Sequence, residues 1–248
     1  MTALLQAELI KLRTTRTFLA LTAAAVGTSL LITVLVALLT EPSQDDVLTD
    51  VFASDTSSLF ITILAVIGIT GEWRHHTITS SVLAAPDRLR FLTAKLIAFA
   101  VAGLVLSLLI SIAITIAGLI ILTVRELPTP GAGELLEQIA RNALVAALLG
   151  AFGVGIGALV RNQVVAVVGL LVLGFAVDPA VAALVPEVGR FSPFSALPIG
   201  ITDVPPEDAG LPEEVDVLSP GLALLAMLAW IGAAFAAGAA LLIKRDLD

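Results

Sequence analysis

The sequence lacks cysteine and contains little charge. Charged residues make up 14% of its 248 positions, hydrophobic types make up 58%, and the mean hydropathy is +1.05. The absence of cysteine excludes disulfide bonds, thiolate metal ligands and a cysteine nucleophile. The apolar content exceeds what one water-soluble core can bury, so a soluble single domain is not expected.

Positive charge is scarce as well. The chain has 13 Lys and Arg against 21 Asp and Glu, a formal net charge of −8. Nucleic-acid binders need a basic surface to neutralise phosphates, so nucleic acid is not an expected partner. Among the basic residues, Arg outnumbers Lys ten to three. Together with much Ala, Gly and Val, this usage is typical of a GC-rich bacterial genome.

The sequence also lacks the common devices for catalysis. A phosphate-binding loop requires a lysine directly after glycine, but Lys11, Lys95 and Lys244 each follow isoleucine or alanine. His75 and His76 are adjacent and would point about 100° apart on a helix, which suits a metal poorly. We therefore expect no catalytic residue, no metal and no bound cofactor on this chain.

Six apolar runs dominate the chain, and each approaches the roughly 20 residues that a helix needs to cross a bilayer. They predict an all-α polytopic membrane protein with one transmembrane domain over residues 1–248. Asp178-Pro179 is expected to break or end the fifth span, because proline removes a backbone donor. The predicted spans are 18–39, 57–70, 96–124, 143–160, 164–185 and 221–243.

The distribution of positive residues predicts the orientation, because Lys and Arg close to spans are retained in the cytoplasm. Placing both termini inside puts ten of the 13 basic residues inside and only Arg125, Arg141 and Arg190 outside. The middles of the spans carry no charged residue, which disfavours ion-gradient-driven transport. It does not exclude such transport, since backbone carbonyls also bind sodium.

Residues 1–17 are expected to form an interfacial helix on the cytoplasmic face. Leu5, Leu9 and Leu12 form an apolar stripe, with Glu8 and Lys11 beside it. The alternative is a simple basic flank to the first span.

The strongest local signal is the polar segment between the second and third spans, residues 71–88. Ile78 and Val82 recur at helical spacing, Pro86 ends that helix, and Asp87 can cap a second helix that runs into the third span. A short amphipathic helix of this kind suits docking on a soluble partner. The alternative is an ordinary charged loop.

In the fourth span, Gly153 and Gly157 are four residues apart, which lets helices approach closely. They are expected to form a contact face within or between subunits. The alternative is that glycine and alanine merely reflect the composition of the genome.

The motifs together resemble those of the permease subunits of type 2 ATP-binding-cassette exporters. That family has a Glu-x-x-Lys helix before the first span, which Glu8 to Lys11 match. It also has a cytoplasmic stretch after the second span, an Arg-Asn pair after the fourth, and an outer Ser-Pro-Phe. The matching residues are Glu72, Trp73, Arg74, Thr77, Ile78, Leu83, Pro86, Arg88, Lys95, Arg161-Asn162 and Ser192-Pro193-Phe194, while His76 replaces the usual glycine.

The resemblance implies a plasma-membrane subunit that dimerises with itself or a sibling permease and rests on a cytosolic ATPase, which would bind ATP and Mg²⁺. Export would be powered by that partner. The alternative function is a channel or secondary transporter that acts without an ATPase. The resemblance places the docking site at Glu72, Arg74, Thr77, Ile78, Val82, Leu83 and Pro86.

Overall fold

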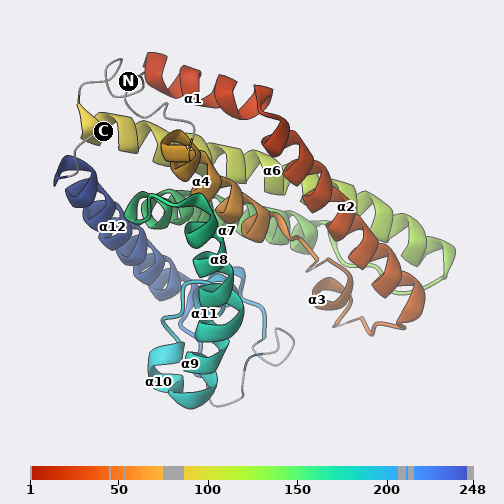
Figure 1. Ribbon diagram of the computed structural model, residues 1–248. Helices are drawn as coiled ribbons and strands as arrows, with labels where there is room; N and C mark the ends of the chain where they lie inside the picture. Colours follow the sequence, from red (N-terminus) through yellow and green to blue (C-terminus); the bar gives the residue numbers. More distant parts are fainter. Residues whose placement is uncertain are drawn as a thin grey trace.

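The computed structural model describes residues 2–44, 46–52, 54–74, 87–205, 211 and 215–244, and all regular structure in these ranges is helical (Figure 1). The elements are α1 (Thr2–Thr14), α2 (Arg16–Leu39), α3 (Val47–Phe52), α4 (Ser57–Arg74), α6 (Arg88–Val124), α7 (Ala132–Leu159), α8 (Gln163–Val172), the π-helical turn η1 (Leu173–Val177), α9 (Asp178–Leu184), α10 (Pro186–Gly189), α11 (Ala196–Thr202) and α12 (Pro220–Lys244).

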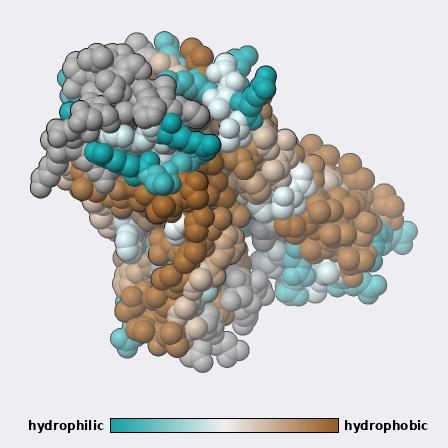
Figure 2. All heavy atoms as spheres, in the orientation of Figure 1, coloured by the Kyte–Doolittle hydropathy of each residue, from teal (hydrophilic) through white to brown (hydrophobic). Residues whose placement is uncertain are grey.

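Within the described ranges, six helical segments are long and apolar enough to cross a membrane. They are α2, α3 with α4, α6, α7, α8 through α9, and α12. Hydrophobic residues cover the flanks of these helices, and hydrophilic residues gather at the upper end and along the lower rim (Figure 2). The predicted all-α class is thereby confirmed for the described residues, and the six long apolar helices indicate a multi-pass membrane protein. Its orientation stays a prediction.

The bundle has two ends, which we name after the helices that lie there. The α1 end holds α1, the end of α4, the start of α6 and the end of α12, and the α3 end holds α3 and the end of α6 (Figure 1). Helix α6 connects them with 37 residues, about 55 Å at 1.5 Å per residue. It begins eight residues before the predicted span, where the Asp87 carboxylate caps it by accepting the N–H groups of Leu89 and Arg90.

The predicted break of the fifth span at Asp178-Pro179 is wrong. The chain stays helical from Gln163 to Leu184, and the five residues before Asp178 form the π-helical turn η1. In η1 the N–H of Asp178 donates to the Leu173 carbonyl, five residues earlier. Pro179 therefore stands at the first positions of the new α-helical segment, where a missing N–H and a fixed φ are tolerated.

Helix α7 is the most buried of the six candidate spans and lies at the centre of the bundle, in contact with α4, α6 and α12. Small residues bring the backbones together. A Cβ atom added at Gly103 of α6 would lie 2.3 Å from the Ala146 carbonyl oxygen, and one at Gly153 would lie 2.8 Å from the Thr62 carbonyl oxygen. Gly157 faces α4 in the same way, so both glycines lie at a contact within one chain.

Arginines cap the ends of neighbouring helices. Arg125, directly after α6, donates to two carbonyls at the end of α2 at 2.6 and 2.8 Å. Arg141 of α7 donates to the Thr202 carbonyl at the end of α11 (2.8 Å), and Arg88 of α6 donates to the Leu242 carbonyl near the end of α12 (2.6 Å). Cations at helix C-termini satisfy free carbonyls and complement the helix dipole.

We expect Gly103→Ala to destabilise the protein by about 1–3 kcal/mol, because the added methyl group meets backbone that can move only if α6 and α7 separate. Thermal unfolding in detergent measures the effect. Gly169→Ala in α8 is the matched control, since nothing lies within 4 Å of its added Cβ atom. Equal stability of the two variants would contradict the packing described.

Candidate functional site

Four charged side chains from three helices meet at the α1 end. The Lys95 ammonium of α6 lies 2.6 Å from Glu8 Oε2 of α1 and 2.8 Å from Glu72 Oε1 of α4. Lys11 of α1 lies 2.9 Å from Glu8 Oε1 and 3.2 Å from Glu72 Oε1. Each lysine thus contacts both carboxylates, and we call this arrangement the charge ring.

The charge ring is mostly shielded from solvent. The Lys95 side chain is 2% exposed and those of Glu8 and Glu72 are each 8% exposed, whereas Lys11 lies at the rim and is 51% exposed. Burial of charges costs free energy, and the cost is offset only when opposite charges and hydrogen bonds surround each group. Two ammonium groups and two carboxylates make the ring neutral, which meets that condition.

The pKa values of the α1 members of the ring follow from their surroundings. Burial alone would raise the pKa of the Glu8 carboxyl, but Lys95 and Lys11 outweigh burial and hold it below its ordinary value of 4.5. Burial alone would lower the pKa of Lys11, but Glu8 and Glu72 raise it above 10.5. Both groups are therefore charged near neutral pH.

The charge ring joins three helices through residues that flank the predicted docking segment in the chain. Glu72 lies at the end of α4 and Lys95 in the second turn of α6, so they flank residues 75–86 in the chain. Glu8 and Lys11 add α1 to this junction. The structure therefore brings the Glu-x-x-Lys pair of the sequence to the segment after the second span.

Sequence reasoning named Glu8, Lys11 and Glu72 as site residues but missed the role of Lys95. A lysine inside an otherwise apolar helical stretch was the available signal, because such a residue needs a buried counter-charge. Which carboxylates supply it depends on how three helices pack. The sequence alone does not define that arrangement.

The other predicted docking residues divide into two groups. Arg74 ends α4 and donates to Gln163 Oε1 of α8 at 3.3 Å. The guanidinium carbon of Arg161 lies 4.8 Å from the centroid of the neighbouring Trp73 ring. These contacts join the fourth-to-fifth span connection to the end of α4. The remaining predicted residues, Thr77, Ile78, Val82, Leu83 and Pro86, lie outside the described residues.

A second polar cluster lies inside the bundle, around Asp55 at the start of α4. Its Oδ2 accepts hydrogen bonds from Ser107 (2.6 Å) and Ser111 (2.7 Å), both near the middle of α6, and its Oδ1 accepts the Ser57 N–H at 2.8 Å. The sequence placed Asp55 just before the second span. Its partners on α6 place the carboxylate well within the length of the bundle. A carboxylate at this depth is compatible with gradient-driven transport, which the charge-free middles of the predicted spans disfavoured.

Hydroxyl groups of α2 extend this cluster. Ser29 and Thr56 share a hydrogen bond of 2.8 Å, and Thr33 and Ser54 form another. Ser29 and Thr33 are fully buried. These hydroxyls therefore pair α2 with the residues that connect α3 to α4.

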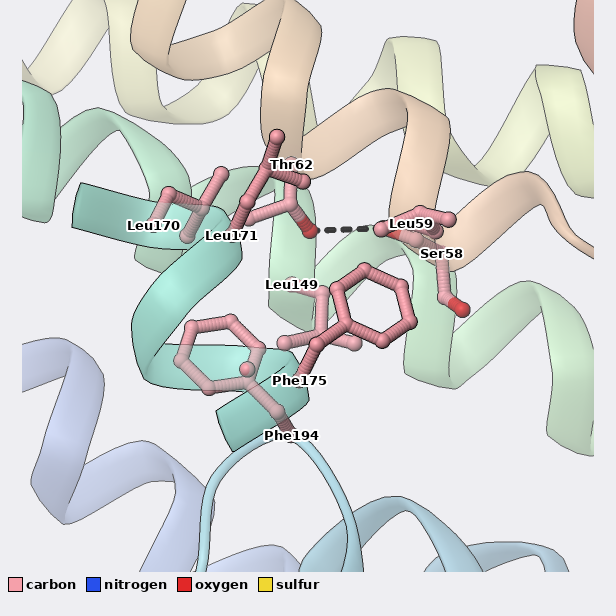
Figure 3. A pocket seen from close by; sticks show the side chains of 9 residues that line it. Ser58, Leu59, Thr62, Leu149, Leu170, Leu171, Phe175 and Phe194 are labelled. Carbon is pink, nitrogen blue, oxygen red and sulfur yellow. Dashed lines mark hydrogen bonds between the residues drawn. The ribbon is translucent and has the colours of Figure 1, made fainter. Parts of the chain in front are cut away.

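An apolar cavity of about 220 Å³ lies between α4 and the fifth span. Figure 3 shows side chains of α4, α7, the fifth span and Phe194 around it. The Phe194 ring, from the Ser-Pro-Phe motif, also lies 5.6 Å from the Phe152 ring of α7, centroid to centroid. Gly174 and Phe175 of the π-helical turn line the cavity, and π-helical turns occur frequently at functional sites.

No family model matches the chain, and no curated protein is significantly similar to it. In the part of the chain that the structure describes, no three His, Cys, Asp or Glu residues are grouped to hold a metal ion.

We expect Lys95→Met to lower stability by about 3–5 kcal/mol, because it leaves Glu8 and Glu72 buried with only the half-exposed Lys11 to neutralise them. Adding Glu8→Gln restores a neutral ring and should recover part of the loss. Thermal unfolding in nanodiscs measures both effects. Arg90→Met is the control, since it removes a positive charge from an exposed pair on the same helix. A double variant no more stable than Lys95→Met would contradict the ring.

The free energy of unfolding that Glu8 contributes should fall when the protein is acidified. Its folded pKa is depressed, so the contribution is present above its ordinary pKa of 4.5 and disappears as the pH falls through the folded value. The stability difference between the unsubstituted protein and Glu8→Gln should therefore be constant from about pH 8 to about pH 5 and shrink at lower pH. Unfolding midpoints measured across this range check it, and a difference that grows on acidification would refute the ion pairing of Glu8.

Proposed function

We propose that this chain is the permease subunit of an ATP-driven exporter of the type 2 ATP-binding-cassette class. The charge ring is the observation that supports the proposal. It joins two of the sequence motifs that carry the family resemblance, Glu8 to Lys11 and the stretch that begins at Glu72, through direct ion pairs. Two motifs 61 residues apart in the chain therefore belong to one junction.

A junction of this kind suits the transmission of movement. A partner that pushes on residues 75–86 acts on the end of α4 and the start of α6 together, and the ring carries α1 with them. For ATP to drive transport, the ATPase must contact two permease states differently. Because the charge ring joins α1, α4 and α6, a change in the ATPase contact would displace these three helices together.

The remaining parts of the proposal follow from the resemblance. ATP and Mg²⁺ would bind to a separate cytosolic ATPase, a second permease copy or a sibling would complete the path, and the assembly would lie in the bacterial plasma membrane with both termini inside. This orientation places the charge ring on the cytoplasmic side, where the ATPase acts.

A second candidate function is a secondary transporter that works without an ATPase. The Asp55 carboxylate favours it, because carboxylates inside membrane bundles often bind coupling ions or protons. The test reconstitutes this chain alone in liposomes. Solute uptake driven by an ion gradient would favour this candidate over the exporter.

The decisive experiment coexpresses the chain with the ATP-binding-cassette ATPase encoded nearest to it. We expect the two proteins to copurify, and Ile78→Asp or Val82→Asp to lower the amount of bound ATPase at least about tenfold, because a buried charge opposes an apolar contact. Leu89→Asp is the matched control, since it adds the same charge at an exposed leucine of the same end. Full copurification and ATPase turnover with both docking variants would refute the assignment.

A further inference from the structure

Two cavities with different chemistry adjoin along α4. The apolar cavity between α4 and the fifth span has a polar neighbour of about 270 Å³, lined by α7, residues 198–204 and the start of α4. Ser58 lines both cavities, so they lie next to each other along α4. Together they offer one polar and one apolar compartment.

Asp55 gives the polar cavity its charge. It is the only charged residue among the described residues that line this cavity, and the described residues form no ion pair with it. Arg141, one residue before the lining Asn142, is held by Glu137 (2.6 Å) and Asp203 (3.1 Å). Among the described residues, the Asp55 carboxylate therefore has no cationic partner at this cavity.

The polar cavity has free hydrogen-bond acceptors, which favour a ligand that donates hydrogen bonds. Asp55 Oδ2 already accepts two serine hydroxyls, whereas Oδ1 accepts only the Ser57 N–H and retains one lone pair. The buried Gln138 donates from Nε2 to Asn142 Oδ1 at 3.0 Å, and its Oε1 has no partner among the described residues. Two acceptors, one of them on a carboxylate, fit a cation that carries N–H groups.

The apolar cavity fits the remainder of such a molecule. Leu149, Leu170, Leu171 and the two phenylalanine rings of Figure 3 form its wall. The Phe175 side chain at its rim is 67% exposed on the apolar flank of the bundle. An apolar chain can therefore reach this cavity from the hydrocarbon of the bilayer without crossing a polar surface.

We propose that the two cavities form one binding site for an amphipathic primary amine. The ammonium group donates hydrogen bonds to Asp55 and Gln138, and the apolar chain passes Ser58 into the cavity between α4 and the π-helical turn. As a statement about the exported substrate class, the inference rests on the proposed function. The binding itself requires no ATPase and is tested without one.

The test uses the full chain in phosphatidylcholine nanodiscs and two photoreactive probes. One is a long-chain primary alkylamine with a diazirine near the end of its chain, and the other is the alcohol of equal length. We expect the amine to label peptides that contain Leu59, Leu170 or Phe175, and Asp55→Asn to lower that labelling about tenfold, because a charge-assisted hydrogen bond is lost. Labelling by the alcohol should not depend on Asp55.

Two further variants keep the result interpretable. Asp46→Asn removes an exposed negative charge at the same end, outside the cavity lining, and should leave amine labelling unchanged. Gln138→Leu leaves the Asp55 carboxylate and its hydrogen bond from the Ser57 N–H in place. It should lower amine labelling about threefold, because the Gln138 Oε1 acceptor is lost. Helical circular dichroism and gel filtration identify any variant that fails to fold.

Amine labelling that is the same in Asp55→Asn, or that falls equally for amine and alcohol, would overturn the site. Neither result bears on copurification with the ATPase. The binding site and the proposed function are therefore tested separately. Replacing phosphatidylcholine by phosphatidylethanolamine identifies the source of the ammonium group. Suppressed labelling points to the lipid headgroup, unchanged labelling points to a free amine, and both outcomes support the site.

Discussion

A lysine inside a membrane bundle needs its counter-charges within hydrogen-bond distance, and Lys95 imposes that constraint on this protein. Its ammonium group lies between Glu8 and Glu72, so α1, the end of α4 and the start of α6 must meet where it stands. Lys11 contacts the same two carboxylates and makes the group neutral. The position of the N-terminal helix and the separation of the helices that flank residues 75–86 both depend on this neutrality, because loss of one partner strands a buried charge.

The bundle also follows the rules of packing in lipid, where apolar surface gains little by leaving hydrocarbon. Helix α7 approaches its neighbours through small residues, and the contacts of Gly103 and Gly153 are with backbone carbonyl oxygens. The Asp55 carboxylate finds its hydrogen-bond donors inside the protein, in Ser107, Ser111 and the Ser57 N–H. All three donors are neutral, so hydrogen bonds rather than an ion pair hold this carboxylate among the described residues.

The sequence predicted the features that depend on local pattern. Apolar length predicted six crossing helices, and the position of Asp87 predicted the start of α6. Features that depend on packing were missed. The partners of Lys95 come from two other helices, the depth of Asp55 depends on how α4 lies against α6, and the proline at 179 is accommodated by a π-helical turn that no propensity marks. The predicted docking residues from Thr77 to Pro86 lie outside the described residues, so their placement stays a prediction.

The arginine caps limit how the helices can move. Arg88 and Arg125 lie at opposite ends of α6, and each binds terminal carbonyls of a different span, α12 at one end and α2 at the other. Sliding either span along its own axis by one helical turn, about 5.4 Å, would break its cap. Tilting or rotating it about the capped end keeps the cap. Helix α6 therefore fixes the axial position of α2 and α12 relative to itself. Conformational change in this bundle should proceed by tilting of these helices rather than by their sliding along their axes.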